Sequence, residues 1–224
     1  MKNDPGCARS PESGLRAVRQ VKIPHHLYSC LIHSLREHLA LLHGRSGAVQ
    51  GQWQRCHPDH TAAATMNRLV NLATQRLRTA DTVAAAEWGT SGPIADPARE
   101  KVLLDAVSAG AAQRGLDPRE CTSVFQDQIE ANKVMQYGLF SNWSAEPGRA
   151  PTTAPDLGQA RLELDRITGE LLDALAATRT TWGSADCAPA LREAVDDAER
   201  DQHLDALHRR GLDRAVRSVC RCRA

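Results

Sequence analysis

Aromatic residues and long apolar runs are scarce in this sequence of 224 residues. Phe, Trp and Tyr make up only 4% of the chain, which disfavours a β-sheet protein because strands are rich in aromatic and β-branched residues. No stretch approaches the roughly 18 uninterrupted apolar residues of a membrane-spanning helix. An excess of one charge is also missing, since 28 Lys and Arg nearly balance 27 Asp and Glu. This balance argues against a general binder of nucleic acid or of anionic membranes.

Apolar and charged residues are present in ordinary amounts. Apolar residues make up 42% and charged residues 25% of the chain, which is the balance of a soluble globular protein. Alanine and leucine, both strong helix formers, are abundant. The length suits one or at most two domains. We therefore expect an all-α fold.

The first 65 residues differ in composition from the rest. They hold seven of the nine histidines and carry eight Lys and Arg against four Asp and Glu. Their most apolar stretch, 27–42, is interrupted by charged residues and lacks the clean apolar run of a signal peptide. We expect residues 1–65 to be an N-terminal extension that is disordered or translated from upstream of the true start. Residues 66–224 are expected to form the folded domain.

Apolar residues recur at helical spacing after this extension, and capping residues divide the pattern. Asp117, Pro118 and Glu120 together form a strong helix start, with an N-cap, a proline in the first turn and a glutamate at the third position. Asp96 and Asp156 are expected to cap two further helices. The pattern predicts a bundle of about six helices, at about 66–88, 97–114, 118–143, 157–181, 188–199 and 201–220.

Several polar residues lie where the helical pattern places the core. Arg76 and residue 87 are eleven positions apart, which puts them within about 20° of the same helix face, with small apolar residues between them. Arg76 therefore projects into the interior or follows the surface past small neighbours. Gln128, Asn132 and Gln136 form a stripe of amides at i, i+4 and i+8. This stripe either borders solvent or lines a polar cavity.

Two further arginines extend this pattern to other predicted helices. Arg99 lies in a first helical turn, where the helix dipole disfavours a cation. Arg161 lies beside Leu157 and Leu164, which belong to an apolar face. Taken together, the arginines and amides describe an anion pocket within a helical bundle.

Spaced motifs in the same part of the chain carry a more specific signal. They are RLRTAD at 76–81, AAAEW at 84–88, PIAD at 93–96, FQDQIEANK at 125–133 and PDL at 155–157. In this order they resemble AroQ-type chorismate mutases, in particular the secreted gamma subclass. The resemblance implies an all-α enzyme, usually a homodimer, that converts chorismate to prephenate for aromatic amino acid biosynthesis. It also implies that the reaction needs no metal or cofactor.

The resemblance assigns roles to five residues of the expected pocket. Arg76, Arg99 and Arg161 correspond to substrate-binding arginines, which suit the two substrate carboxylates because a guanidinium binds a carboxylate through two parallel hydrogen bonds. Gln136 corresponds to the catalytic side chain that donates to the ether oxygen, and Asn132 to a carboxylate contact. A neutral glutamine donates without titrating near neutrality. The implied mechanism therefore requires no general base.

Two positions depart from the family pattern. Glu87 stands where the family has a catalytic lysine directed at the ether oxygen and a carboxylate, and losing such a donor costs on the order of 3–4 kcal/mol. Leu103 stands where related enzymes have a polar partner for the ring hydroxyl, and Glu100 is an alternative partner. Three alternatives stay open. The chain is an active mutase with Glu87 turned away or protonated, a weakened or inactive binding protein, or an isochorismate-pyruvate lyase on the same fold.

The resemblance also implies a disulfide between Cys187 and Cys220, which lie where gamma-subclass enzymes carry one. Closing a loop of this length contributes between about 3 and 4 kcal/mol to stability. Disulfides persist in oxidising compartments, so we expect a secreted or periplasmic protein. No signal peptide is visible in this chain.

Overall fold

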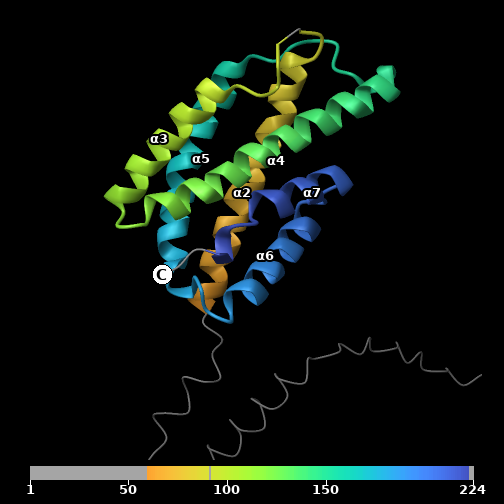
Figure 1. Cartoon of the computed structure of the whole chain (residues 1–224). Helices are drawn as coiled ribbons and strands as arrows, with labels where there is room; N and C mark the ends of the chain where they lie inside the picture. Colours follow the sequence, from red (N-terminus) through yellow and green to blue (C-terminus); the bar gives the residue numbers. More distant parts are fainter. Residues whose placement is uncertain (1–59, 91, 222–224) are drawn as a thin grey trace, which may run out of the picture. The chain divides into compact units, whose positions relative to one another are not determined.

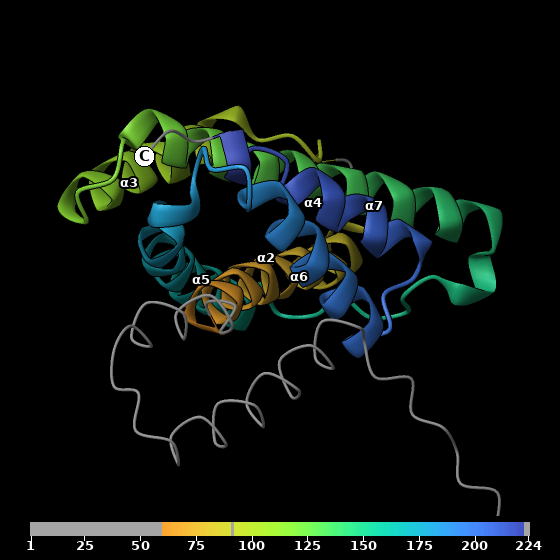
Figure 2. The same ribbon diagram turned by 90° about the horizontal axis from the view of Figure 1, so that it is seen from below.

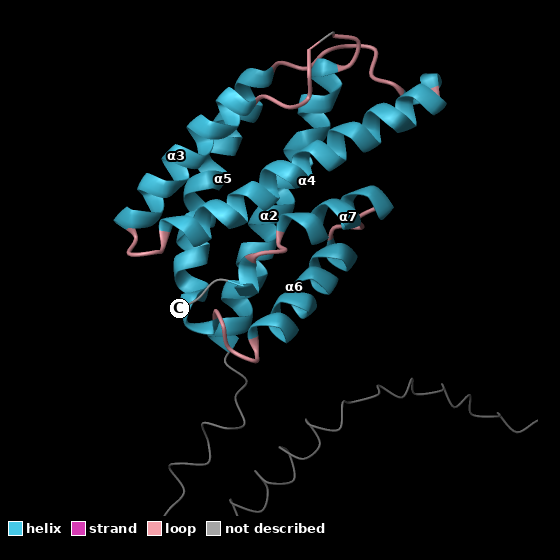
Figure 3. Cartoon of the chain, viewed as in Figure 1, coloured by secondary structure: helices cyan, strands magenta, loops and turns pink. Residues whose placement is uncertain are grey.

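The computed structural model describes residues 60–90 and 92–221 of the chain. These residues form helices and connecting loops, with no strand among them (Figure 3). The predicted extension over 1–65 falls outside the described residues as far as residue 59. No helix in the described part is long and apolar enough to cross a membrane.

Six α-helices make up the described fold, which confirms the predicted all-α bundle (Figure 1). Short 3-10 helices follow three of them. In chain order the elements are α2 (His60–Glu87), α3 (Pro97–Gln113), α4 (Pro118–Ala145), η2 (Pro147–Arg149), α5 (Leu157–Thr178), η3 (Arg179–Thr181), α6 (Cys187–Asp201), α7 (Ala206–Ala215) and η4 (Val219–Arg221).

Aspartates cap three of the helices, as the sequence predicts. Asp96, Asp117 and Asp156 each accept a hydrogen bond from a backbone N–H in the first turn of α3, α4 and α5, at 3.0, 2.8 and 2.9 Å. Each bond satisfies one of the N–H groups that a helix leaves without an internal partner. These caps set where the three helices begin.

Two helix boundaries differ from the prediction. α2 begins at His60, so the last residues assigned to the extension are helical; their alanines and threonines carry no apolar period that would reveal this. The helix predicted over 201–220 is replaced by the shorter α7. His203 has a φ of 50°, and Asp205 accepts hydrogen bonds from two backbone N–H groups, both at 2.9 Å. The chain therefore turns and starts a new helix at Ala206.

α2 is the central helix of the bundle. It packs against α4, α5, α6 and α7, while α3 packs against α4 and α5. Figures 1 and 2 both show α7 beside α4, with α6 on the same side of α2. The apolar faces meet in one core, whose largest fully buried side chains include Met66, Leu69, Leu77, Phe125, Met135, Ile167, Leu171, Leu175 and Leu212.

Glycine allows α7 to lie close to α2 and α4. A Cβ atom at Gly211 of α7 would lie 2.9 Å from Leu77 Cδ1 and 3.0 Å from Met135 Sδ. Such contacts are too short for a side chain in a packed core. The absence of a side chain at residue 211 therefore sets this helix spacing.

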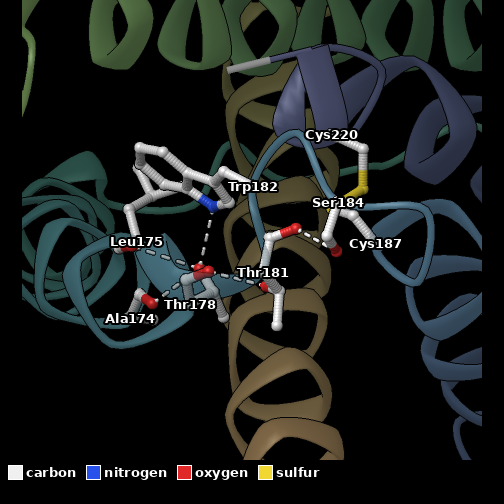
Figure 4. The surroundings of a disulfide bond; sticks show 8 residues. All are labelled: Ala174, Leu175, Thr178, Thr181, Trp182, Ser184, Cys187 and Cys220. Atoms are coloured by element: carbon white, nitrogen blue, oxygen red, sulfur yellow. Dashed lines mark hydrogen bonds between the residues drawn. A yellow bond between two sulfur atoms is a disulfide. The ribbon is translucent and has the colours of Figure 1, made fainter. Parts of the chain in front are cut away.

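A disulfide joins Cys187, at the start of α6, to Cys220 in η4 (Figure 4). The segment after α7 is thereby fastened to the first turn of α6. Beside the disulfide, Trp182 Nε1 donates to Thr178 Oγ1 at 3.2 Å, and Thr181 Oγ1 donates to the Thr178 carbonyl at 2.6 Å. Covalent and hydrogen-bonded links thus hold the connection between α5 and α6.

Candidate active site

A cavity of about 660 Å³ lies among α2, α3, α4, α5 and the loop before α3. All seven residues singled out by the resemblance line it: Arg76, Glu87, Arg99, Leu103, Asn132, Gln136 and Arg161. They come from four helices and are separated by up to 85 positions in the sequence. Packing of these helices around α2 brings them to one place.

Arg76 is the buried cation of this cavity. Its side chain comes from the middle of α2 and the residue is only 5% exposed. One guanidinium nitrogen donates to Thr168 Oγ1 of α5 at 3.3 Å, and the guanidinium lies 5.8 Å from the centre of the Phe125 ring. Nε is buried without a hydrogen-bond partner among the described residues. A buried N–H without a partner is costly, so this donor is suited to an anionic ligand in the cavity.

Burial also changes the acidity of Arg76. Desolvation lowers the pKa of its guanidinium to about 10, against the nearby charge of Asp165, which raises it. Burial disfavours the charged form, yet a pKa this high leaves the group cationic at neutral pH. The cavity therefore holds a buried positive charge.

Arg99 and Arg161 lie at the exposed part of the cavity. Arg99 is in the first turn of α3, with its side chain 69% exposed and its Nε 3.7 Å from Asp96 Oδ2. Arg161 follows the first turn of α5 and is exposed. One interior and two outer arginines thus line the cavity from three helices.

The stripe of amides on α4 divides between the cavity and the core. Asn132 and Gln136 line the cavity. Gln136 is 7% exposed, and its Oε1 is buried without a hydrogen-bond partner in the described part of the chain. Gln128 is not a cavity residue, because it turns to α7 and its Nε2 donates to the Ala215 carbonyl at 2.9 Å. The i, i+4, i+8 spacing of the amides in the sequence does not distinguish Gln128, which packs against α7, from the two amides that line the cavity.

Glu87 and Leu103 are cavity residues at the two positions that depart from the family pattern. Burial raises the pKa of the Glu87 carboxyl; the Arg99 charge lowers it and Asp96 raises it further. Leu103 is partly buried against the hydrophobic core. Glu100, one turn before Leu103 on α3, also lines the cavity. The alternative partner for the ring hydroxyl therefore also belongs to the cavity lining.

Comparison with known proteins gives the family. Residues 66–137 match the family model for chorismate mutase type II. A secreted chorismate mutase of Mycolicibacterium smegmatis is 34% identical over 165 residues, which cover 74% of this chain and 91% of the relative. A secreted chorismate mutase of Mycobacterium tuberculosis is 36% identical over 152 residues, covering 68% and 76%. The chain belongs to the AroQ-type family of secreted chorismate mutases.

Solved structures agree with this chorismate mutase assignment. The crystal structure of a chorismate mutase from Burkholderia thailandensis aligns with a TM-score of 0.66 and 36% identity, covering 70% of this chain and 99% of that one. A chorismate mutase from Burkholderia phymatum aligns with a TM-score of 0.67 and 35% identity, covering 71% and 98%. The described helices therefore have the chorismate mutase fold.

One cationic residue of this chorismate mutase cavity is absent from the sequence-based prediction. Lys133 lines the cavity from α4 and forms ion pairs with Glu100 of α3 and Glu130 of α4, each at 2.9 Å. Its spacing from Glu130 is that of an ordinary surface pair on a helix. A cationic residue next to Asn132 was the available signal. No group of three or more His, Cys, Asp or Glu side chains in the described residues is arranged to hold a metal ion.

Proposed function

We propose that this chain catalyses the rearrangement of chorismate to prephenate in the cavity among α2, α3, α4 and α5. The observation that carries the proposal is the buried Arg76, whose Nε has no partner among the described residues. It shares the cavity with Arg99, Arg161 and Gln136. Three guanidinium groups and an amide form a donor set for a small dicarboxylate.

The arginines act on the conformation of the substrate. Chorismate is a dianion whose flexible enolpyruvyl arm has to lie over its ring before the new C–C bond can form. Arg76 binds one carboxylate from inside, while Arg99 and Arg161 hold the other from the exposed part of the cavity. Holding the reactive conformer lowers the entropic part of the barrier.

Gln136 acts on the bond that breaks. As the C–O bond lengthens, negative charge grows on the ether oxygen, and a donor fixed at that position stabilises the transition state more than the ground state. The Gln136 amide provides such a donor from α4. No proton is transferred, so the chemical step itself requires no acid or base.

Glu87 is compatible with this function when it is protonated or points away from the substrate. Burial raises the pKa of its carboxyl, which favours the neutral form in a site that binds a dianion. A neutral carboxyl neither repels the substrate carboxylates nor removes positive charge from the cavity. The acid at residue 87 then weakens catalysis without abolishing it.

A matched pair of α5 variants tests the proposal. Arg161→Ala removes a cavity guanidinium and is expected to lower kcat/KM for chorismate by about 100-fold, measured by loss of chorismate absorbance. Arg166→Ala removes an arginine of the same helix outside the cavity lining, which pairs instead with Glu163 and Glu170. It is expected to stay within about twofold of the wild type, because exposed ion pairs contribute little. Equal losses in both variants would contradict the proposed site.

The cellular location follows from the cysteines and the relatives. The Cys187–Cys220 disulfide is suited to an oxidising compartment, and two relatives are named as secreted. We infer that the protein acts outside the cytoplasm, in the periplasm or beyond, and as the homodimer usual for its family. Light scattering checks the dimer, and a mass shift on reduction of peptides from the purified native protein checks the disulfide.

A further inference from the structure

The charges that line the cavity cancel in number. Two sets of four side chains of opposite sign line it, namely Arg76, Arg99, Lys133 and Arg161 against Glu87, Asp96, Glu100 and Asp165. When all are ionised, the lining attracts a dianion only through cations that approach it more closely than the acids do. How strongly each cation attracts the dianion therefore depends on whether its N–H donors can point into the cavity.

Lys133 is held at the cavity by two carboxylates. Its Nζ lies 2.9 Å from Glu100 Oε1 and 2.9 Å from Glu130 Oε1. The side chain is only 19% exposed. Glu100 Oε2 also accepts a hydrogen bond from Nζ, at 3.1 Å. An ammonium has three N–H donors, so a ligand that displaces Glu100 gains a donor while Glu130 keeps its own. Glu130 is not part of the cavity lining and can stay paired with Lys133 when a ligand binds.

The environment keeps this lysine charged. Burial lowers the pKa of the Lys133 ammonium, but hydrogen bonds to Glu130 and Glu100 outweigh this effect and raise the pKa above its usual value. Lys133 also lies one residue after Asn132 and three before Gln136, and all three line the cavity from α4. A cation is thus fixed beside two of the amides already assigned to substrate.

We propose that Lys133 is a catalytic residue whose ammonium contacts the bound dianion and supplies the positive charge that Glu87 does not provide. The inference rests on the proposed function. The cation that the family pattern places on α2 is then supplied by α4. The site therefore has four cationic side chains although residue 87 is acidic. Glu130 balances Lys133 from outside the cavity, while the substrate competes with Glu100 for it inside.

Variants at both positions test this inference. Lys133→Met is expected to lower kcat/KM for chorismate by at least about 30-fold, while Lys133→Arg retains the charge and most of the activity. In a Glu87→Lys background, Lys133→Met is expected to cost less than about threefold, because residue 87 then carries the cation. Lys101→Met is the matched control: Lys101 pairs with Asp105 on the exposed side of α3 and lies outside the cavity lining.

If Lys133 only links α3 to α4, its substitution affects activity differently. Lys133→Met would then reduce activity by the same factor in the wild-type and in the Glu87→Lys background, or leave activity unchanged, and either result overturns the inference. Circular dichroism and the thermal midpoint establish that each variant is folded. A variant that unfolds is replaced by Lys133→Gln.

Binding of a bicyclic dicarboxylate transition-state analogue separates this inference from the proposed function. Calorimetry is expected to give at least a tenfold higher Kd for Lys133→Met than for the wild type and for Lys101→Met. A wild type that binds the analogue but forms no prephenate refutes the proposed reaction while Lys133 is still tested by Kd. Unchanged Kd in Lys133→Met refutes the role of Lys133 alone.

Discussion

The cavity side and the C-terminal side of the molecule differ in how their buried N–H donors are paired. Around α6 and α7, the Trp182 N–H donates to a threonine hydroxyl, and both ring nitrogens of His208 face carboxylates, Nδ1 at 2.9 Å from Asp205 and Nε2 at 3.1 Å from Asp81. In the cavity, Arg76 Nε has no partner among the described residues. Ring donors are paired on one side, and a cationic donor is left over on the other.

This difference separates what stabilises the fold from what binds a ligand. Most buried polar groups in folded proteins are paired, because an unpaired group costs free energy. On the C-terminal side, which the disulfide holds, the ring N–H groups are paired as this rule requires. The cavity breaks the rule where the resemblance to chorismate mutases places a substrate carboxylate. Substitutions in the cavity are therefore expected to affect activity, and substitutions on the C-terminal side to affect stability.

The largest effect is expected at the cavity. Arg76→Met removes the buried charge but keeps the length and apolar stem of the side chain, and we expect kcat/KM for chorismate to fall by about 1000-fold. The free energy of unfolding should change by less than about 1 kcal/mol, because the lost hydrogen bond is offset by the desolvation that the charge no longer requires. Steady-state kinetics and urea unfolding measure the two quantities. A large loss of stability would show that Arg76 is chiefly structural.

The disulfide gives the opposite pattern with a smaller effect. Replacing Cys187 and Cys220 by serine together is expected to lower the free energy of unfolding by between about 3 and 4 kcal/mol, because the unfolded chain gains freedom. Activity at room temperature should stay close to that of the wild type, since neither residue lines the cavity. Urea unfolding with and without reductant measures the loss. A marked fall in kcat/KM for folded protein would remove the separation between the two sides.

The smallest effect is expected at His208 and depends on pH. The hydrogen bond to Asp81 raises the pKa of His208 above its usual value, burial lowers it, and Asp205 raises it further. The resulting stability is full below the unfolded pKa of about 6.5 and is lost as the pH rises through the higher folded pKa. His208→Gln should therefore destabilise the protein more in mildly acidic than in alkaline buffer. An equal loss in both buffers would show that protonation contributes nothing.

The sequence was sufficient for most of the fold because its capping signals are local. Asp117 followed by Pro118 defines the start of α4 without reference to any other helix. The predicted start of α7 is wrong because His203 has a positive φ. In a sequence such a turn is usually indicated by glycine, and residue 203 is histidine. The start of α2 was missed because alanine and threonine permit a helix without an apolar period. Both errors have the same cause, because the local sequence contains no signal for where the helix begins.

The candidate site was predictable only in part. Arg76 stood out because a charge at an apolar position conflicts with the helical pattern, and the motif resemblance named six further residues that line the same cavity. Lys133 was missed because its partner Glu100 belongs to another helix, and pairs between helices are set by packing. Gln128 and Gln136 share one helix face, yet only their neighbours decide that Gln128 binds Ala215 of α7.

The most direct test of the account is to follow chorismate and its products by proton magnetic resonance in the presence of the wild-type protein. Prephenate is expected to accumulate mole for mole as chorismate disappears, faster than in buffer alone. The same rate of chorismate loss with and without protein would refute the proposed activity. So would release of pyruvate in place of prephenate.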